Sequence, residues 1–355
     1  MDPNRFQEGF RRLEAAGKGI PDRVPVTAQL HEFAMRWTGS DGFRFYADAE
    51  NLVSGIVRTA SDFGFDVPNI AYDVYNIEIE AMGQPILFTA GAAPVADPAT
   101  VLVREPADLG RLSVPEAGKA ARMPFVLDLQ RLYQRETGRP PTLQFCAPFT
   151  MASMVRGYAG LIADIYADPA QVHELLGFLT EKVIAPWIRV QAAAFPRSSL
   201  AMGADALCSP PMTNPRIIEE FSIPYIMRLR ELCPIPVAVV NWWGESSVKS
   251  VEEFLGLKRR VGVGLLRVQD PDVARMGVRV FKDYAVRHGL TLEVGVGDSL
   301  LNGGPIPEIR ERIRRYIGEA AAGGRFIVYL ASLNADTPPE HVRAALDAIR
   351  EFGGY

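Results

Sequence analysis

Short apolar runs alternate with longer amphipathic segments along almost the whole chain. Turn residues bound the apolar runs, and the segments between them repeat their apolar positions at helical spacing. Eight of the runs have the length and composition of strands, at 24–30, 67–73, 141–147, 198–208, 235–243, 261–268, 290–297 and 325–331. This alternation is typical of βα units around a parallel sheet, and eight strands close a barrel. We therefore predict one α/β domain, a (β/α)8 TIM barrel over residues 1–355.

Helix signals between the strands support this order. Three segments begin with a capping residue followed by proline, at Asp168, Asn214 and Thr337. Pro224 lies inside the second of these helices and is expected to kink it. The predicted helices are 45–64, 168–194, 214–233 and 337–353.

Two further stretches add to the barrel. Residues 84–123 are rich in Ala and Pro and lack a clear period, so we expect an insertion between strands two and three with short edge strands. The first nineteen residues form a charged amphipathic stretch, which predicts extra N-terminal helix. The stretch lacks the apolar core of a signal peptide, and we expect a cytoplasmic protein.

Composition excludes several classes of protein. The net charge is −4 with both signs mixed along the chain, which argues against nucleic acid as a partner. The chain has no run of eighteen apolar residues, so no membrane span is expected. The three cysteines, Cys146, Cys208 and Cys233, have no CxxC spacing, which excludes a disulfide framework and a four-cysteine zinc site. We expect them to be small buried residues.

The barrel prediction by itself selects candidate site residues, because active sites of such barrels lie at the carboxyl ends of the strands. The polar and aromatic residues at these positions are His31, Asp73, Ser209, Asn241, Trp242, Trp243, Glu245, Gln269, Asp270, Asp298, Ser332 and Asn334.

Asp73 and His31 are the candidates for proton transfer. Asp73 lies between Tyr72 and Tyr75, and a carboxylate among aromatic rings tends toward a raised pKa. A turn-capping role for this aspartate is the alternative. His31 follows the first strand, where it could act as a general acid or base, or serve as a structural histidine.

The run Asn241-Trp242-Trp243-Gly244-Glu245 ends the fifth strand. Adjacent strand residues face opposite sides, so we expect one tryptophan in the core and the other in the pocket. A pocket tryptophan near Glu245 would suit a flat aromatic or cationic ligand, whereas burial of both rings under helices is the alternative. The Gly-rich stretch 295–304, with Asp298, is a poor dinucleotide fingerprint but follows strand seven, where barrels often bind phosphate. P-loop, HExxH and GxSxG motifs are absent from the sequence.

Several short motifs occur in an order and spacing that resemble the uroporphyrinogen decarboxylase superfamily. This group includes the decarboxylase and methyltransferases that exchange methyl groups with corrinoid proteins. The resemblance implies a (β/α)8 barrel and places Asp73 where the decarboxylase has its pyrrole-binding aspartate. The matching motifs are Asp22–Val26, Pro148–Thr150 with Gly157, Asp168-Pro169 with His173, Ser209–Pro215 with Glu220-Phe221 and Pro224-Tyr225, Gly295–Asp298 with Leu301, and Thr337–Glu340.

The chain departs from both branches of this superfamily. The decarboxylase has an arginine-rich loop after strand one, whereas residues 29–33 here read Gln-Leu-His-Glu-Phe, with Arg36 nearby. Holding many carboxylates would need several arginines, so decarboxylation of uroporphyrinogen is not expected. The methyltransferase branch holds zinc after strands five and eight, and the corresponding positions here are Asn241, Trp243 and Ala331 or Ser332. Zinc prefers thiolate and imidazole, so we expect no metal site.

These features lead to a first hypothesis, a metal-independent methyltransferase of the URO-D-like superfamily. It would move a methyl group between a small aromatic or cationic substrate and a corrinoid, with cobalamin presented by a partner protein. Asp73, His31 or Glu245 would protonate the leaving atom. The expected substrate-binding residues are Tyr72, Tyr75, Ser209, Asn241, Trp242, Trp243, Asp298 and Asn334.

Two alternatives remain open. A carboxy-lyase would use Asp73 to stabilise a protonated intermediate and would release carbon dioxide without cobalamin. A non-catalytic barrel would bind a ligand tightly without turnover. A homodimer is the expected oligomeric state, since it is the commonest one.

Overall fold

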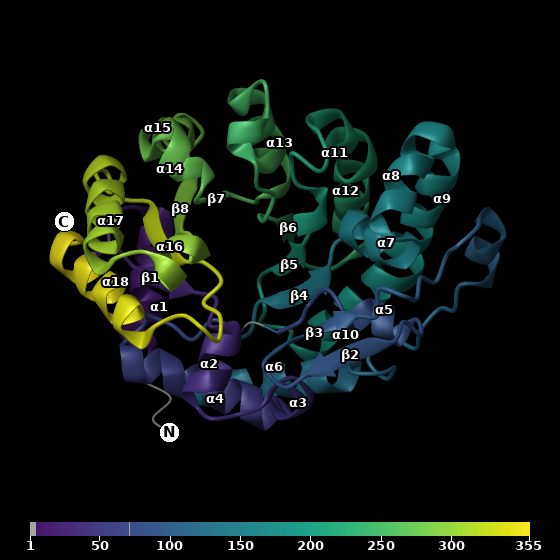
Figure 1. Ribbon diagram of the computed structural model, residues 1–355, viewed down its shortest axis with the longest axis horizontal. Helices are drawn as coiled ribbons and strands as arrows, with labels where there is room; N and C mark the ends of the chain where they lie inside the picture. The colour runs from purple at the N-terminus through teal and green to yellow at the C-terminus, as the bar shows by residue number, and fades with distance from the viewer. Residues whose placement is uncertain (1–4, 71) are drawn as a thin grey trace.

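The computed structural model describes residues 5–70 and 72–355, and the chain folds as a (β/α)8 TIM barrel. Figure 1 shows the strands around a common centre with helices outside them. The barrel strands are β1 (Val26–Ala28), β4 (Leu143–Cys146), β5 (Ala201–Ala204), β6 (Val237–Val239), β7 (Leu265–Gln269), β8 (Thr291–Val296) and β9 (Phe326–Leu330). All paired neighbours among them run parallel, in the orders β1-β9-β8-β7 and β4-β5-β6.

The predicted second strand, 67–73, is wrong for the residues described there, 67–70 and 72–73, which form no ladder with β1 or β4. Pro68 lacks the N–H that a central strand must donate. Side chains replace the ladder on both sides of the segment. The Asp66 carboxylate accepts a hydrogen bond from Val26 N of β1 at 2.8 Å, and Gln144 Nε2 of β4 donates to Ile70 O at 3.0 Å.

A second opening in the ladder lies between β6 and β7, and a buried lysine bridges it. Lys258 Nζ donates to Trp242 O just after β6 and to Arg267 O of β7, each at 2.7 Å. The same ammonium pairs with Glu245. A side-chain cation therefore links two strands whose backbones do not pair.

The insertion after the second βα unit is confirmed. It forms the antiparallel hairpin of β2 (Ile86–Thr89) and β3 (Ala92–Ala96), followed by the 3-10 helix η1 (Pro106–Arg111). This two-stranded sheet is separate from the barrel sheets.

The helices follow the predicted order with local differences. The predicted helix 45–64 is two helices, α3 (Gly42–Ala47) and α4 (Ala49–Phe63), because Asp48 caps α4 by accepting from Glu50 N and Asn51 N. The predicted helix 168–194 begins at its Asp168 cap but contains a π-helical turn, η2 (Leu179–Ile184), between α9 (Pro169–Phe178) and α10 (Ala185–Ala194).

The other two predicted helices also differ in detail. Residues 214–233 begin at the predicted Asn214 cap and break at Ser222, next to Pro224, into α11 (Pro215–Phe221) and α12 (Ile223–Leu232). Thr337 does not cap α18 (Pro339–Phe352), because its hydroxyl accepts from Asn334 N instead. The remaining helices are α1 (Gln7–Lys18), α2 (His31–Trp37), α5 (Ile77–Ala81), α6 (Met123–Thr137), α7 (Pro148–Arg156), α8 (Tyr158–Ala167), η3 (Ala206–Cys208), η4 (Glu245–Ser247), α13 (Val251–Val261), α14 (Asp272–Met276), α15 (Val278–Arg287), α16 (Asp298–Gly303) and α17 (Ile306–Ala320).

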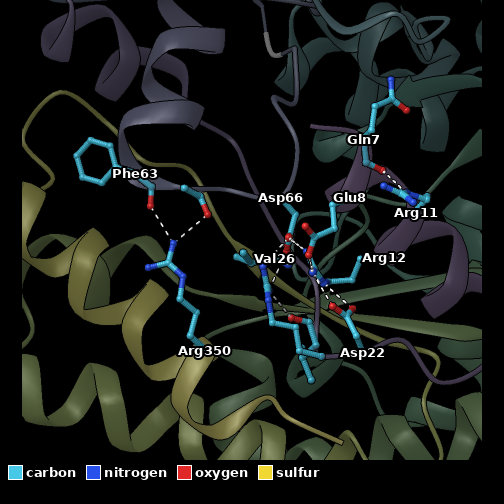
Figure 2. Close-up of polar contacts among 12 residues, drawn as sticks. Gln7, Glu8, Arg11, Arg12, Asp22, Val26, Phe63, Asp66 and Arg350 are labelled. Carbon is cyan, nitrogen blue, oxygen red and sulfur yellow. Dashed lines mark hydrogen bonds and ion pairs between the residues drawn. The ribbon is translucent and has the colours of Figure 1, made fainter. Parts of the chain in front are cut away.

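The predicted N-terminal helix, α1, carries a buried arginine that ties it to the strand segments. Figure 2 shows Arg12 contacting Asp66, Asp22 and Glu8. Arg23 also donates to Asp66, at 2.7 Å. Asp66 therefore joins α1, β1 and the unpaired second segment through one buried carboxylate.

None of the described helices is long and apolar enough to cross a membrane. Cys146 and Cys208 are buried as predicted, whereas Cys233 is partly exposed, and all three are free thiols.

Candidate active site

Asp73 is held by an arginine that the sequence did not single out. Arg122 donates to both oxygens of the Asp73 carboxylate, at 3.0 and 2.7 Å, and its Nε donates to Glu80 at 2.6 Å. Asn76 Nδ2 adds a contact to Asp73 at 3.3 Å. Burial raises the pKa of the Asp73 carboxyl and the Arg122 fork opposes that shift. Both oxygens of this aspartate are therefore occupied by a charge-assisted fork.

His31 begins α2 at the end of β1 and is half-buried. Its φ of 29° is in the left-handed region, which is strained for a residue with a side chain. Burial lowers the pKa of its imidazole, so the ring is neutral near neutral pH. The neighbouring Glu32 accepts from Tyr46 Oη and Ala93 N, each at 3.0 Å. His31 therefore presents a neutral imidazole at the mouth of the barrel, beside a carboxylate that is already hydrogen-bonded.

Asn241, which follows β6, hydrogen-bonds Tyr75 and Asp205 from two other segments of the chain. Its Nδ2 donates to Tyr75 Oη at 3.1 Å, and its Oδ1 accepts from Asp205 N at 2.9 Å. These bonds bring together residues 166 positions apart along the chain. The amide thus orients a phenol at the carboxyl ends of the strands.

Asp205, just after β5, organises the loops around Asn241 and was missed by the strand-end selection. It is fully buried, and its carboxylate accepts from Trp242 Nε1 at 2.9 Å, Ser222 Oγ at 2.8 Å and Thr150 N at 3.0 Å. Burial raises the pKa of this carboxyl, and these hydrogen bonds oppose the shift. The only sequence signal for it was its place directly after a strand, inside the predicted run 198–208.

The two tryptophans face different surroundings, as predicted. Trp242 is buried, whereas Trp243 is partly exposed, with Lys258 Nζ 5.3 Å from its ring centroid. Trp243 N donates to Ser209 Oγ at 3.0 Å. Glu245 is only 1% exposed and is paired with Lys258, so the structure contradicts its predicted role as a proton donor to substrate.

Other predicted site residues make local or outward contacts. Tyr72 is buried between the second segment and β4, where its hydroxyl donates to Gln144 O at 3.4 Å, and it lines a small cavity against α6. Asp298 accepts from Ser299 N at 2.8 Å. Asn334 accepts from Asp336 N at 2.9 Å. Their side chains therefore stabilise turns or a strand seam.

Two further strand-end residues link neighbouring elements. Asp270 accepts from Arg312 at 2.7 Å and from the Tyr316 hydroxyl, which ties the end of β7 to α17. Ser332, with a φ of 49°, donates to Gln29 Oε1 at 3.3 Å and thereby joins the loops after β9 and β1.

Glu78 of α5 is a buried carboxyl beside β4. Its Oε1 accepts from Cys146 N of β4 at 2.8 Å, while its Oε2 has no partner among the described residues. Burial raises the pKa of Glu78 to about 8. The group is therefore protonated at neutral pH while it takes the place of a strand bond to β4.

We expect this carboxyl to make stability pH-dependent. Between the ordinary pKa of 4.5 and about 8, the unfolded chain ionises Glu78 while the folded chain keeps the proton. The stability that the protonated Glu78 contributes is therefore fully present below pH 4.5. It is lost as the pH rises through about 8. Relative to Glu78→Gln, the wild type should lose about 3–5 kcal/mol of unfolding free energy over this range. Urea unfolding at several pH values measures the difference.

The exposed Glu174 provides the control. Glu174→Gln should leave the pH profile of unfolding unchanged. A constant difference between wild type and Glu78→Gln from pH 4.5 to 8 would contradict the raised pKa of Glu78.

The positions at which the sequence resemblance would place zinc ligands do not fit that ion. Asn241 offers an amide whose two ends are already hydrogen-bonded, Trp243 an indole, and Ser332 a hydroxyl. Zinc prefers thiolate and imidazole ligands. Among residues 5–70 and 72–355, no cluster of three His, Cys, Asp or Glu side chains could hold a metal.

Comparisons with known proteins identify the family and the fold of the chain. The sequence matches the family described as uroporphyrinogen decarboxylase (URO-D) over residues 10–352. Uroporphyrinogen decarboxylase of Hamiltonella defensa is 29% identical, with 96% of this chain and 91% of that protein covered. The Anaeromyxobacter dehalogenans protein of the same name is 28% identical, with 86% of each covered. Among solved structures, a methyltransferase from Methanosarcina mazei superposes with a TM-score of 0.77 at 19% identity, over 96% of this chain and 98% of that one. The structural likeness confirms the predicted fold.

Proposed function

The chain belongs to the uroporphyrinogen decarboxylase family, and from this premise we propose that it is a methyltransferase of the URO-D-like superfamily. Members of this superfamily are decarboxylases or methyltransferases. The proposed reaction moves a methyl group between a small aromatic substrate and a corrinoid carried by a partner protein. The corrinoid supplies the nucleophile that takes the methyl group. The residues of this chain bind and orient the substrate and protonate its leaving oxygen.

The observation that carries the proposal is the pair Asn241 and Tyr75. Asn241 occupies the position that resembles the first zinc ligand of the methyltransferases, but its amide donates to Tyr75 Oη at 3.1 Å. Because the phenol oxygen accepts this bond, its own proton is left to donate. Tyr75 can therefore take over the electrophilic role of a metal. As the methyl carbon leaves, the C–O electron pair stays on the substrate oxygen, which takes the proton from Tyr75. The Tyr75 phenolate then regains a proton from water.

The charges around the mouth favour a small substrate over a tetrapyrrole. Arg122 is engaged by Asp73 and Glu80, and Arg312 by Asp270. A tetrapyrrole with many carboxylates needs several available arginine forks. The partly exposed Trp243 offers a flat apolar surface, and the Lys258 ammonium against its ring disfavours a cationic ligand.

Tyr75→Phe is expected to lower the rate of methyl transfer about 100-fold, because it removes the proton donor and keeps the ring. The rate is measured from the loss of the cob(I)alamin absorption band with 4-methoxybenzoate and a panel of other aryl methyl ethers. Tyr72→Phe is the matched control, since the Tyr72 hydroxyl donates to Gln144 O in the seam with β4. An unchanged cobalt spectrum with the wild type across the whole panel would exclude the function, and equal rates for Tyr75→Phe and wild type would exclude Tyr75 as the donor.

Decarboxylation of a smaller acid is the second candidate, and the name of the curated relatives favours it. Asp73 would then stabilise a protonated intermediate. In the structure both of its oxygens accept from Arg122, so this role would require the fork to open. Carbon dioxide release from aryl and pyrrole acids without cobalamin, lost in Asp73→Asn, is the result that would replace the first proposal with this one.

A further inference from the structure

Strand β7 carries an arginine on its inner face. Leu266 and Val268 are buried at 1% and 0% exposure, so alternate residues place Arg267 on the opposite face, toward the barrel axis. Its Nε donates to Glu293 of β8. Glu293 in turn accepts from Thr27 Oγ1 of β1 at 2.9 Å, although β9 lies between those two strands. A contact that reaches over an intervening strand lies inside the barrel.

This interior arginine is nevertheless accessible. Its side chain is 17% exposed, whereas that of Glu293 is 5% exposed. Solvent therefore reaches part of the guanidinium although Arg267 lies within a barrel strand. Gln269 on β7 and Met202 and Ala204 on β5 are also partly exposed. These residues therefore border accessible space beside Arg267, which is called the lumen here.

The geometry of the guanidinium leaves one edge for a ligand. Only Nε is hydrogen-bonded to the described part of the chain, by Glu293, and the two terminal amino groups have no acceptor there. The Tyr329 ring stacks against the guanidinium, with 5.0 Å between Cζ and the ring centroid, and this contact restrains its plane. Two parallel N–H groups on a fixed plane match the two oxygens of a carboxylate.

The lumen also connects this arginine with the proposed proton donor. Tyr329 of β9 lies against Arg267 and, together with Gln269, flanks Gly295 of β8. Burial raises the pKa of the Tyr329 hydroxyl, and Tyr75 adds to that shift. Tyr75 is held at the mouth by Asn241, and Arg267 lies one inward-facing position below Gln269. A ligand that reaches both residues would have its acid group deep in the lumen and its opposite end at the mouth.

We propose that Arg267 binds the carboxylate of the substrate, so that the substrate is an aryl methyl ether with a single acid group. The inference rests on the proposed function for the identity of the reacting molecule, and adds the group that recognises it. One available guanidinium edge accommodates one carboxylate. With the acid group on Arg267, the methyl ether at the other end of the ring lies beside Tyr75 and faces the opening.

Matched ligands test this directly in calorimetric binding experiments. The probes are 4-methoxybenzoate, 3-methoxybenzoate and benzoate, compared with the neutral 4-methoxybenzamide. The wild type should bind 4-methoxybenzoate about 10–100-fold more tightly than the amide, the range of a hydrogen bond to a charged group. Arg267→Gln should weaken binding of the acids by the same factor and change binding of the amide by less than about twofold.

A second variant separates binding from folding. Arg267→Gln leaves Glu293 buried without its cation, so the double variant Arg267→Gln/Glu293→Gln, which removes both charges, is measured beside it. Arg287→Gln is the control, since Arg287 pairs with the exposed Glu252 on the outer surface. Circular dichroism checks that each variant is folded.

Three outcomes would overturn the inference. They are equal affinity of the wild type for acid and amide, full acid affinity in the double variant, and no binding of any acid at millimolar concentration. The methyl-transfer proposal has a different readout, the cobalt spectrum. If acids bind in an Arg267-dependent way while the cobalt spectrum stays unchanged, the acid subsite is supported and only the proposed function is excluded.

Discussion

Arg122→Met is expected to lower the free energy of unfolding by about 3–5 kcal/mol, because it leaves a buried carboxylate without its cation. The side chain of Asp73 is 2% exposed and that of Arg122 is 11% exposed, so little water is available to solvate the charge left behind. Glu80, at 21% exposure, loses the same partner. The change would also release both oxygens of Asp73 from the fork.

Urea unfolding measures the effect. The double variant Arg122→Met/Asp73→Asn should recover more than half of the loss, because it removes the orphaned charge as well as the fork. Arg131→Met within α6, the helix that begins directly after Arg122, is the matched control. Its partner Asp128 is 59% exposed, so we expect a change below about 0.5 kcal/mol. If Arg122→Met and Arg131→Met were equally stable, the fork at Asp73 would contribute nothing.

Lys258→Met should have a comparable effect on stability, about 3–5 kcal/mol, for a related reason. Glu245 has no exposed side-chain surface and would keep an unpaired charge. Trp242 O and Arg267 O would also lose the donor that joins β6 to β7. Because the ammonium lies against the Trp243 ring, the substitution should shift tryptophan fluorescence as well.

Urea unfolding and native-state hydrogen exchange along β6 and β7 measure this second effect. Lys258→Met/Glu245→Gln should restore part of the stability while exchange in the two strands stays fast, because no donor bridges the seam. Lys282→Met is the matched control. That lysine is also buried and donates to Gly324 O, but it is not paired with a carboxylate, so we expect about 1–3 kcal/mol. Unchanged exchange in β6 and β7 would contradict the bridging role of Lys258.

The elements that were predicted correctly depend on local chemistry. Seven apolar runs became barrel strands, and Asp168 and Asn214 cap helices as predicted. These features depend on residue spacing and on one side chain near one backbone group. The prediction of a strand at 67–73 was wrong because Asp66 and Gln144 supply hydrogen bonds that the pattern of apolar residues cannot reveal.

The candidate site was also predicted only in part, since its residues were found but their contacts were not. By itself, the sequence determined the barrel and the positions of His31 and Asn241 at strand ends, because strand order and the strand-end rule follow from the pattern along the chain. Asp73 and Tyr75 were selected by the same rule, although the segment before them forms no strand. Only the tertiary structure decided what these positions contact.

Arg122 lies 49 residues from Asp73, and Tyr75 lies 166 residues from Asn241. Arg267 stands inside a predicted strand, where its inward direction and its partner on β8 depend on how the barrel closes. Barrel closure brings distant charges into one buried space, where each must be neutralised or left for a ligand. Asp73 and Glu245 are neutralised by cations within the protein, whereas the guanidinium of Arg267 stays accessible.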